Sequence, residues 1–323
     1  MVTPTDTPLP LFIIGSGRSG TTMLRLMLNC HSAIRIPRES WFIINLIDEL
    51  PGHGPLSDTQ RRRAHEIIRT HSRWKDWECD DAVLLSAITE HPQPDLAGLV
   101  DAVFRRCSGM GDARRWGDKT PKYSLYARKM AAVFPEAFFI HMIRDARDVY
   151  LSMKLARWFG GSARRIGKYW RSTTESAAEL RTVCSSRYRE VHYEELVKDP
   201  EKQLRDICEV LGENFERAML SFYESAATET APWEESLHSK TRRAPRYQDL
   251  ERWRKELSIL EILLIESVVY KTMLSVGQKP HFGPAWEPLR IFIRIFFKSI
   301  EYFITLKNSD FQQVQKFPSF LLK

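Results

Sequence analysis

Short apolar runs alternate with amphipathic stretches along this chain. Three segments have the length of a strand: two are continuous apolar runs, and the third is Val191 with its more polar neighbours. Each is followed by a helical pattern. The segments are Leu9–Ile14, Ala137–Ile143 and Tyr188–Tyr193, and the helical patterns after them cover about Thr21–Cys30, Arg147–Trp158 and Glu201–Leu211. Strands separated by long helical segments are typical of βαβ units. The pattern therefore predicts an α/β fold with a central, mainly parallel sheet.

The segments outside these units predict the rest of the organisation. Residues 41–115, between the first two runs, are helix-like and rich in Trp, His and Arg, so we expect a helical insertion on the substrate side. Residues 224–250 are polar and contain two prolines, which favours a lid loop. We expect one domain over residues 1–284 and a C-terminal helical appendage over residues 285–323.

The C-terminal segment 289–306 has a distinct pattern. Its polar positions recur every three or four residues and form one narrow stripe on an otherwise apolar and aromatic helix. The stripe consists of Arg290, Arg294, Lys298, Glu301 and Thr305. Charges inside the segment argue against a membrane span. Peripheral contact with an anionic bilayer, a homodimer contact and packing against the protein's own core all remain open.

Composition and charge narrow the function classes. The 323 residues are 43% hydrophobic and 28% charged, with a net charge of +7, so the surface should attract anions. The isolated triplet Arg61–Arg63 is typical of a solvated helix face, and we expect no nucleic-acid partner. The nine histidines lack the spacing of a zinc site, so no metal is expected. Five cysteines without a C-x-x-C pair, and no visible secretory signal, favour a reduced, cytoplasmic protein.

The loop after the first run carries the strongest chemical signal. A strand that enters a Gly-rich turn and then a helix presents several backbone N–H groups at the positive end of the helix dipole. In the segment GSGRSGTT, residues 15–22, the glycines permit positive φ angles and the threonines add hydroxyl donors. We predict a phosphate cradle rather than a simple connecting turn. Its members are Gly17, Arg18, Ser19, Gly20, Thr21 and Thr22.

The cradle departs from the usual ATP loop at one position. Its spacing is that of G-x-x-x-x-G-K-S/T, but Thr21 stands where the lysine belongs. Arg18 can supply the missing charge in another geometry. The departure argues against an ordinary kinase, although a small-molecule phosphotransferase that needs magnesium and ATP stays an alternative. A second alternative is a non-catalytic module that binds a nucleotide or a membrane.

Four motifs in sequence order resemble a known family. They are LFIIGSGRSGTTMLRLMLNCHSAIRIPRES from residue 11, WGDKTP from residue 116, IRD from residue 143 through Ser152, and YEEL from residue 193 with the following DP. Together they resemble the sulfotransferases that use 3′-phosphoadenosine 5′-phosphosulfate (PAPS), over about residues 9–215. The likeness is closest to the tyrosylprotein and the bacterial carbohydrate or lipid branch. The resemblance implies a P-loop-like fold and in-line transfer of a sulfuryl group from PAPS to an acceptor hydroxyl of a carbohydrate, lipid or other metabolite.

A second group of residues is expected to bind the far end of the donor. Arg144 follows a strand and would point into the crevice where α/β sheets bind ligands. An arginine and a hydroxyl suit a phosphate monoester, and the resemblance assigns Arg144 and Ser152 to the 3′-phosphate. It also places Tyr193 near the nucleotide. The plain alternatives are a surface pair of Arg144 with Asp145 and an ordinary half-buried tyrosine.

The residues that act on the acceptor and on the leaving group come last. By position Glu39 matches the family's catalytic glutamate, a general base, although it could instead be a surface carboxylate paired with Arg38. The resemblance makes Lys119 a stabiliser of the bridging oxygen, so that Lys119 and Arg18 together neutralise the departing phosphate. In the predicted lid, Lys240, Arg242 and Arg243 are candidates to close over the 3′-phosphate. Spacing does not choose among them, and Lys240 is the one that we assign to the site. Arg147 and Asp148 are expected to be a solvated or capping pair outside the site.

Overall fold

A computed structural model describes residues 9–90, 94–229, 239–293 and 295–296 of the chain. The backbone divides into two compact units. The first contains residues 1–144 and 173–250, and the second contains residues 145–172 and 251–323. Each unit is described by itself below. The predicted boundary between residues 284 and 285 stays a prediction.

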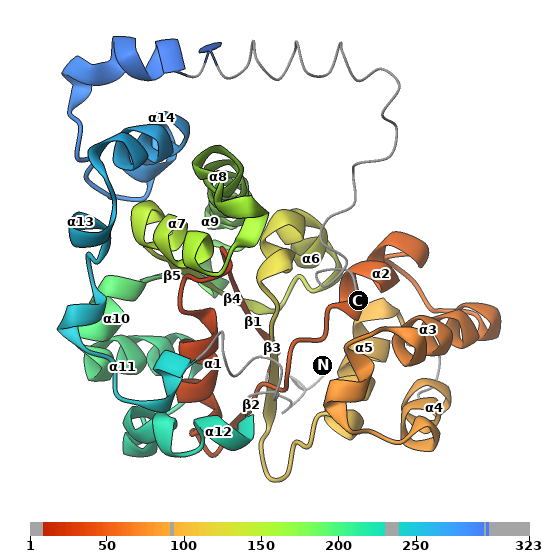
Figure 1. Ribbon diagram of the computed structural model, residues 1–323. Helices are drawn as coiled ribbons and strands as arrows, with labels where there is room; N and C mark the ends of the chain where they lie inside the picture. Colours follow the sequence, from red (N-terminus) through yellow and green to blue (C-terminus); the bar gives the residue numbers. More distant parts are fainter. Residues whose placement is uncertain (1–8, 91–93, 230–238, 294, 297–323) are drawn as a thin grey trace. The chain divides into compact units, whose positions relative to one another are not determined.

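The first unit is built on a five-stranded sheet in the order β2-β3-β1-β4-β5, drawn near the centre of Figure 1. All four strand pairings are parallel, and Ile13 of β1 lies opposite Lys119 of β3 and Ile140 of β4. The α/β fold with a parallel sheet is therefore confirmed. The strands are β1 (Leu11–Gly15), β2 (Ile34–Arg35), β3 (Arg115–Lys119), β4 (Phe138–Ile143) and β5 (Tyr188–His192).

Two strands of the sheet were not predicted. β2 is only two residues long, and β3 has the sequence RWGDK, whose charged residues hide it from a hydrophobicity pattern. Every residue of β3 is nevertheless buried. The insertion predicted for 41–115 is helical as expected, but it leads into β3 rather than directly toward β4. Charged side chains in a buried strand need partners. The partners of Asp118 and Lys119 are Ser40 and Glu39, which belong to the candidate site described below.

The helices of the first unit cover the sheet. Figure 1 shows α2 to α5 (orange) grouped on one side of the strands and α10 to α12 (green to cyan) on the other. The helices are α1 (Thr21–Asn29), α2 (Phe42–Glu49), α3 (Asp58–Thr70), α4 (Asp81–Thr89), α5 (Leu96–Cys107), α6 (Ala127–Val133), α9 (Leu180–Val183), α10 (Tyr193–Lys198), α11 (Pro200–Leu211) and α12 (Ala226–Glu229). The 3₁₀ helices are η1 (Trp74–Trp77), η2 (Pro121–Tyr126), η4 (Ser185–Arg187), η5 (Arg217–Glu224), η7 (Ser239–Arg242) and η8 (Tyr247–Asp249).

Aromatic rings join the sheet to the helical insertion. Trp116 of β3 stacks on Phe104 of α5 with ring centroids 4.1 Å apart, and Phe104 meets Trp77 edge-on at 4.8 Å. These rings belong to a buried cluster that also contains Phe12 of β1 and Phe42 of α2. Burying rings of this size contributes much of a core's stability. The tryptophans of the insertion are therefore packing residues, and they fix β3 against the helices that follow β2.

The second unit consists of helices around its own buried side chains. Its elements are α7 (Ala146–Leu155), η3 (Trp158–Gly161), the first part of α8 (Ala163–Ala178), α13 (Trp253–Glu256), α14 (Ile259–Ser275) and η9 (Pro284–Trp286). Arg147 is 3% exposed and pairs with Asp145 and with the buried Glu266, while the Asp148 side chain accepts from Trp253 N. The expected solvated pair of Arg147 with Asp148 is therefore wrong. Both side chains are structural.

The C-terminal stripe is described only in part. Residues 287–293 and 295–296 are helical, and the rest of 289–306 lies outside the described residues, including Lys298, Glu301 and Thr305. Arg290 is fully buried, lies over the Tyr270 ring and donates to the carbonyl oxygens of Phe282 and Gly283. The apolar Phe292 and Phe296, in contrast, are 62% and 51% exposed. Among the described residues, no helix has the length and hydropathy to cross a bilayer.

Candidate active site

The predicted site residues of the first unit follow the carboxyl ends of its strands. The phosphate loop follows β1, Lys119 ends β3, Arg144 follows β4 and Tyr193 follows β5. Because parallel strands end at the same edge of a sheet, these residues meet at one edge. β1 lies at the centre of the sheet, where successive connections leave in opposite directions. Such a switch point is where open α/β sheets bind their ligands.

The phosphate loop is a tight turn anchored to its neighbour. Ser19 N donates to Ser16 O over 3.2 Å, and Ser124 of η2 accepts from Gly15 N over 2.6 Å. The left-handed position inside the turn is Arg18, with φ 67°, whereas Gly17 is not among the residues with positive φ. The expectation for Gly17 is therefore corrected by one residue. A left-handed residue next to a right-handed one directs successive N–H groups inward, which forms an anion-binding nest.

Two glycines of the loop leave no room for a side chain. A Cβ on Gly15, at φ 144°, would lie 2.4 Å from the carbonyl oxygen of Met142 in β4. A Cβ on Gly20, at φ 93°, would lie 2.4 Å from the Tyr193 ring. Glycine at these positions lets the loop pack directly on β4 and α10. Tyr193 thus forms one wall of the cradle.

The cradle gathers positive charge. Arg144 Nη1 donates to Arg18 O over 3.2 Å, and its guanidinium lies 4.2 Å from the centre of the Tyr193 ring. Burial, followed by the charge of Arg144, lowers the pKa of Arg18 from 12.5 to about 10. Two neighbouring cations in a buried setting favour binding of an anion. Asp145 caps α7 and pairs with Arg147, and the alternative pairing of Arg144 with Asp145 stays a prediction.

An orphaned hydroxyl also points to a ligand. Ser19 is 1% exposed, and its Oγ has no hydrogen-bond partner among the described residues. Buried polar atoms are almost always satisfied, so a site that leaves one open is suited to a ligand that satisfies it. Phosphate oxygens are strong acceptors for such a hydroxyl. The residues of the loop therefore fit a phosphosulfate.

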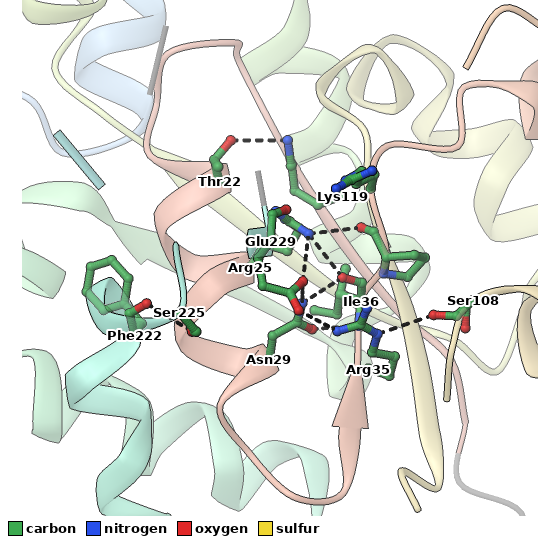
Figure 2. Close-up of polar contacts among 12 residues, drawn as sticks. Thr22, Arg25, Asn29, Arg35, Ile36, Ser108, Lys119, Phe222, Ser225 and Glu229 are labelled. Atoms are coloured by element: carbon green, nitrogen blue, oxygen red, sulfur yellow. Dashed lines mark hydrogen bonds and ion pairs between the residues drawn. The ribbon is translucent and has the colours of Figure 1, made fainter. Parts of the chain in front are cut away.

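Lys119 connects the cradle to the predicted base. Its Nζ donates to Thr22 Oγ1 over 3.1 Å, as Figure 2 shows, and forms an ion pair with Glu39 Oε1. The Lys119 side chain is 2% exposed and that of Glu39 is 14% exposed. The alternative that Glu39 is a surface carboxylate paired with Arg38 is wrong, because Arg38 pairs instead with Glu78. A solvated Lys119 is equally excluded. A carboxylate, an ammonium and a loop hydroxyl therefore lie in one line of contacts.

A buried network holds the chain on which Glu39 sits. Ser40 is fully buried, and its hydroxyl bonds both Asp118 Oδ2 and the Tyr123 hydroxyl, while Thr120 donates to Asp118 Oδ1 over 3.0 Å. Burial raises the pKa of Asp118 from 3.8 to about 6, with Glu39 adding to the rise. Adjacent residues of β3 thus hold adjacent residues after β2. Asp118 anchors Ser40 while Lys119 pairs with Glu39.

A second network lies further along the same face of α1 as Thr22 (Figure 2). Arg25, 2% exposed, donates from Nη1 to Ile36 O and Pro37 O, and from Nη2 to Glu229 O over 2.7 Å. The Glu229 carboxylate accepts from Arg35 over 2.9 Å and from Asn29 over 3.1 Å. The pKa of Glu229 is lowered by these partners despite its burial. This network ties α12 to the backbone that leads to Glu39.

Two predicted ligands lie elsewhere. Ser152 belongs to α7 in the second unit, so its relation to Arg144 stays a prediction. Lys240 belongs to η7, but its side chain lies outside the described residues, as do residues 230–238 of the predicted lid. Arg243 of the same segment pairs with Asp249 over 2.8 Å. No cluster of His, Cys, Asp and Glu suited to a metal occurs in the described part of the chain.

Comparison with known proteins gives the site its context. The model of the sulfotransferase family matches residues 10–217, nearly two thirds of the chain. The chain belongs to the sulfotransferase family. Protein-tyrosine sulfotransferase 1 of Danio rerio is 25% identical over 291 residues, which cover 86% of this chain and 74% of that protein. The Drosophila melanogaster protein-tyrosine sulfotransferase is 27% identical over 216 residues, covering 65% of this chain and 39% of that protein.

A solved structure agrees on the fold. The sulfotransferase domain of the Synechococcus PCC 7002 olefin synthase superposes with a TM-score of 0.58 at 23% identity, covering 84% of this chain and 98% of that one. The chain is therefore a sulfotransferase, an enzyme that transfers a sulfuryl group from PAPS to an acceptor hydroxyl. The matched residues contain the loop, Glu39, Lys119, Arg144 and Tyr193.

Sequence reasoning about this sulfotransferase missed the residues that hold the site together. Asp118 was visible inside the motif WGDKTP, but only the contact with Ser40 gives it a role. Arg25 sits on a helix whose apolar pattern gave no reason to single it out. Trp41 could have been flagged only by its backbone, with φ 57°. Each of these signals depends on tertiary contacts.

Proposed function

We propose that this sulfotransferase uses Glu39 as the general base and Lys119 with Arg18 as the charges on the leaving phosphate. The observation that carries the proposal is the line of contacts from Thr22 through Lys119 to Glu39. The backbone from Gly17 to Thr22 would cradle the 5′-phosphosulfate. Arg144 and Ser152 would hold the 3′-phosphate, with Tyr193 beside the nucleotide and Lys240 closing from the lid.

The chemistry divides among these groups as follows. The acceptor hydroxyl attacks sulfur and forms a new O–S bond, while the bond from sulfur to the bridging oxygen breaks and 3′-phosphoadenosine 5′-phosphate (PAP) leaves. Glu39 takes the proton of the hydroxyl. Charge develops on the departing phosphate, where Lys119 and Arg18 stabilise it without a metal. Because Lys119 already contacts Thr22 of the cradle, a small movement of its ammonium reaches a phosphate bound there.

The pairing of Lys119 with Glu39 supports both roles. The ammonium holds the carboxylate beside the cradle, where a base would be needed. When the lysine turns toward the anionic donor, Glu39 Oε1 is released and can accept the proton of the hydroxyl. Binding of the donor and activation of the base are thereby linked through one side chain. The acceptor itself is proposed as a carbohydrate, a lipid or another alcohol metabolite.

The variant Glu39→Gln tests the base. It keeps the shape of the side chain and removes the proton acceptor, so we expect kcat to fall at least about 100-fold. The Kd for PAP should change less than about twofold. PAP release from PAPS is measured with a panel of methyl glucoside, dodecanol and a tyrosine peptide as acceptors. Glu78→Gln, an exposed carboxylate paired with Arg38, is the matched control. A kcat within threefold of wild type would overturn the proposal.

A surface of the second unit supports a peripheral membrane contact. In the helix after η9, Arg290 of the polar stripe is buried against its own unit, while the apolar Ile291, Phe292, Ile295 and Phe296 are 43–62% exposed. Chain beyond residue 296 continues with further aromatic residues and lysines. We propose that this face binds an anionic bilayer, placing the enzyme at the cytoplasmic face of a membrane. A homodimer contact is the competing outcome.

Liposome sedimentation distinguishes the two. The full chain and a variant lacking residues 285–323 are compared on vesicles of phosphatidylcholine alone and with 30% phosphatidylserine (roughly the anionic surface that attracts basic segments). We expect the full chain alone to sediment, and only with the anionic vesicles. Equal sedimentation of both proteins would contradict the membrane contact. So would a dimer that dissociates on the same deletion, measured by light scattering.

A further inference from the structure

Trp41 has an unusual backbone conformation next to the predicted base. It stands just before α2, with φ 57° and ψ −30°. A bulky residue at positive φ is an outlier, and such conformations persist only where surrounding contacts impose them. They concentrate at functional sites. The contacts that impose this conformation are those of the preceding residue, Ser40. Its buried hydroxyl is held by Asp118 and Tyr123, so the chain on either side of Ser40 has little freedom.

The strained backbone directs the Trp41 side chain back to Glu39. The indole Nε1 donates to Glu39 Oε2 over 2.5 Å. The other carboxylate oxygen, Oε1, is held by Lys119. Glu39 therefore has one oxygen on a charged partner that can move toward the donor, and one on a neutral partner fixed by the backbone. Two donors on separate oxygens define the plane of the carboxylate as well as its position.

Cations hold the Trp41 ring in turn. The Arg73 guanidinium lies 5.7 Å and the Lys122 ammonium 5.6 Å from the ring centre, from the loop before η1 and from η2. Both distances are within the range of cation–π attraction. Burial and then these two cations lower the pKa of the nearby His71 from 6.5 to about 4, so a positive field surrounds the ring. The loop before η1 and the helix η2, together with the contact to Glu39, thus fix the Trp41 side chain.

We propose that Trp41 is the positioning residue of this sulfotransferase, holding the Glu39 carboxylate in place when Lys119 turns to the donor. The inference rests on the proposed role of Glu39. A base must lie within hydrogen-bond reach of the acceptor proton, so its orientation limits the rate. If Lys119 leaves Glu39, the indole N–H is the contact that remains on the carboxylate. Trp41 acts through Glu39 and touches neither the donor nor the reacting atoms.

The variant Trp41→Phe tests this positioning role. It keeps an aromatic ring near the two cations and removes the N–H donor together with the five-membered ring. We expect kcat to fall about tenfold, a fraction of the 10²–10⁴ that an oriented base supplies. The Kd for PAP and the urea midpoint should stay near wild type. The acceptor is whichever member of the panel of methyl glucoside, dodecanol and tyrosine peptide supports turnover. Trp77→Phe is the matched control, since Trp77 Nε1 is buried without a partner among the described residues.

A double-mutant cycle shows whether Trp41 works through Glu39. In the Glu39→Gln background, Trp41→Phe should lower kcat no further, because there is no base left to orient. Equal tenfold losses in both backgrounds would overturn the inference. Full activity of Trp41→Phe, with Glu39→Gln inactive, would overturn it and leave the proposed function standing. An active Glu39→Gln would overturn both.

A second variant keeps the inference testable if Trp41→Phe does not fold. Trp41→His retains a ring N–H and should preserve more of the wild-type kcat than Trp41→Leu, which has none. If the histidine and leucine variants have the same kcat and the same PAP affinity, the N–H has no role and the inference fails. A higher kcat of the histidine variant supports the inference, because packing alone would not favour histidine, which has a ring N–H, over leucine, which has none.

Discussion

At the scale of single residues, the site depends on a few positions whose backbone conformation and packing tolerate little substitution. Gly20 is the N-cap of α1, with φ 93°, and lies against the Tyr193 ring. The Arg144 guanidinium also lies over this ring. Arg18 supplies the left-handed residue of the loop and one of its two cations. Backbone shape and charge are therefore provided by the same few positions, and a change at one affects both.

Gly20→Ala is predicted to weaken the donor site as well as the fold. The new Cβ would meet the Tyr193 ring at 2.4 Å and displace it, together with the guanidinium that rests on it. The matched control is Gly212→Ala, at φ 69° with no heavy atom within 4 Å of the new Cβ. Both pay for a left-handed alanine, on the order of 1 kcal/mol of unfolding free energy. Only Gly20→Ala should also weaken PAP binding, about tenfold or more.

Urea unfolding and a PAP titration of the two variants check this prediction. Equal PAP affinity in Gly20→Ala and Gly212→Ala would show that the Tyr193 contact is not needed for the donor. An equal loss of stability with unequal affinity would still fit, because the ring can move aside at small energetic cost. The affinity is the deciding quantity.

At the scale of elements, β3 and the segment after β2 form the scaffold of the catalytic groups. Asp118 and Lys119, at the end of β3, bind Ser40 and Glu39 respectively, so β3 holds the proposed base in position. One turn after Thr22 on the same face of α1, Arg25 holds the carbonyl groups of Ile36 and Pro37. Buried polar networks of this kind add specificity when every member is satisfied. The cost of burying the charges is visible in the raised pKa of Asp118.

The Asp118 carboxyl should make stability depend on pH. Its pKa is about 6 in the folded protein and 3.8 as the reference value, so the folded state holds its proton more tightly. The stabilisation is fully present below pH 3.8 and is lost as the pH rises through 6, about 3 kcal/mol in all. Asparagine is neutral throughout. The unfolding free energy of Asp118→Asn minus that of wild type should therefore rise between pH 4 and pH 7.

Urea unfolding of both proteins at several pH values between 4.5 and 7.5 measures this difference. Any loss caused by the altered hydrogen bonds with Ser40 and Thr120 is independent of pH and cancels in the slope. Asp112→Asn, at an exposed position, controls for the removal of a carboxyl as such. A difference that stays constant over the range, or falls with pH, would contradict the assignment.

At the scale of the whole molecule, the chain is a basic sulfotransferase whose described residues form two compact units. The first unit contains the sheet, the cradle and the Glu39–Lys119 pair, and its net attraction for anions agrees with an anionic donor. Ser152 and the partly described C-terminal helix belong to the second unit.

The 3′-phosphate should distinguish PAP from adenosine 5′-phosphate in the stability of the first unit. A ligand present at 100 times its Kd adds about 2.7 kcal/mol to the unfolding free energy. We expect PAP to slow amide exchange in β1 strongly, and adenosine 5′-phosphate at the same concentration to do so much less. Arg144→Ala should bring the two ligands together. Equal protection by both nucleotides in the wild-type protein would contradict the 3′-phosphate assignment, and the same experiment with Ser152→Ala tests the hydroxyl.

The hydrophobic pattern and the glycine spacing were enough to predict the strand–loop–helix segments around the proposed phosphate sites. The runs that became β1 and β4 are apolar because central parallel strands are buried on both faces, and the glycines around the phosphate loop indicate a backbone that must pack closely. These features depend on neighbours in sequence, so the sequence reveals them. It also singled out Glu39 and Lys119, because each lies within a motif that resembles the sulfotransferases.

Tertiary structure alone decided how these residues are held. β3 is a buried strand of charged residues, whose burial is tolerable only because Ser40, Glu39 and Thr22 come from elsewhere to meet it. The left-handed residue of the loop proved to be Arg18 rather than Gly17, and Trp41 turned back onto Glu39. Such contacts join residues up to about a hundred positions apart. A pattern read along the chain determines which side chains can do the chemistry, whereas packing in three dimensions determines which of them meet.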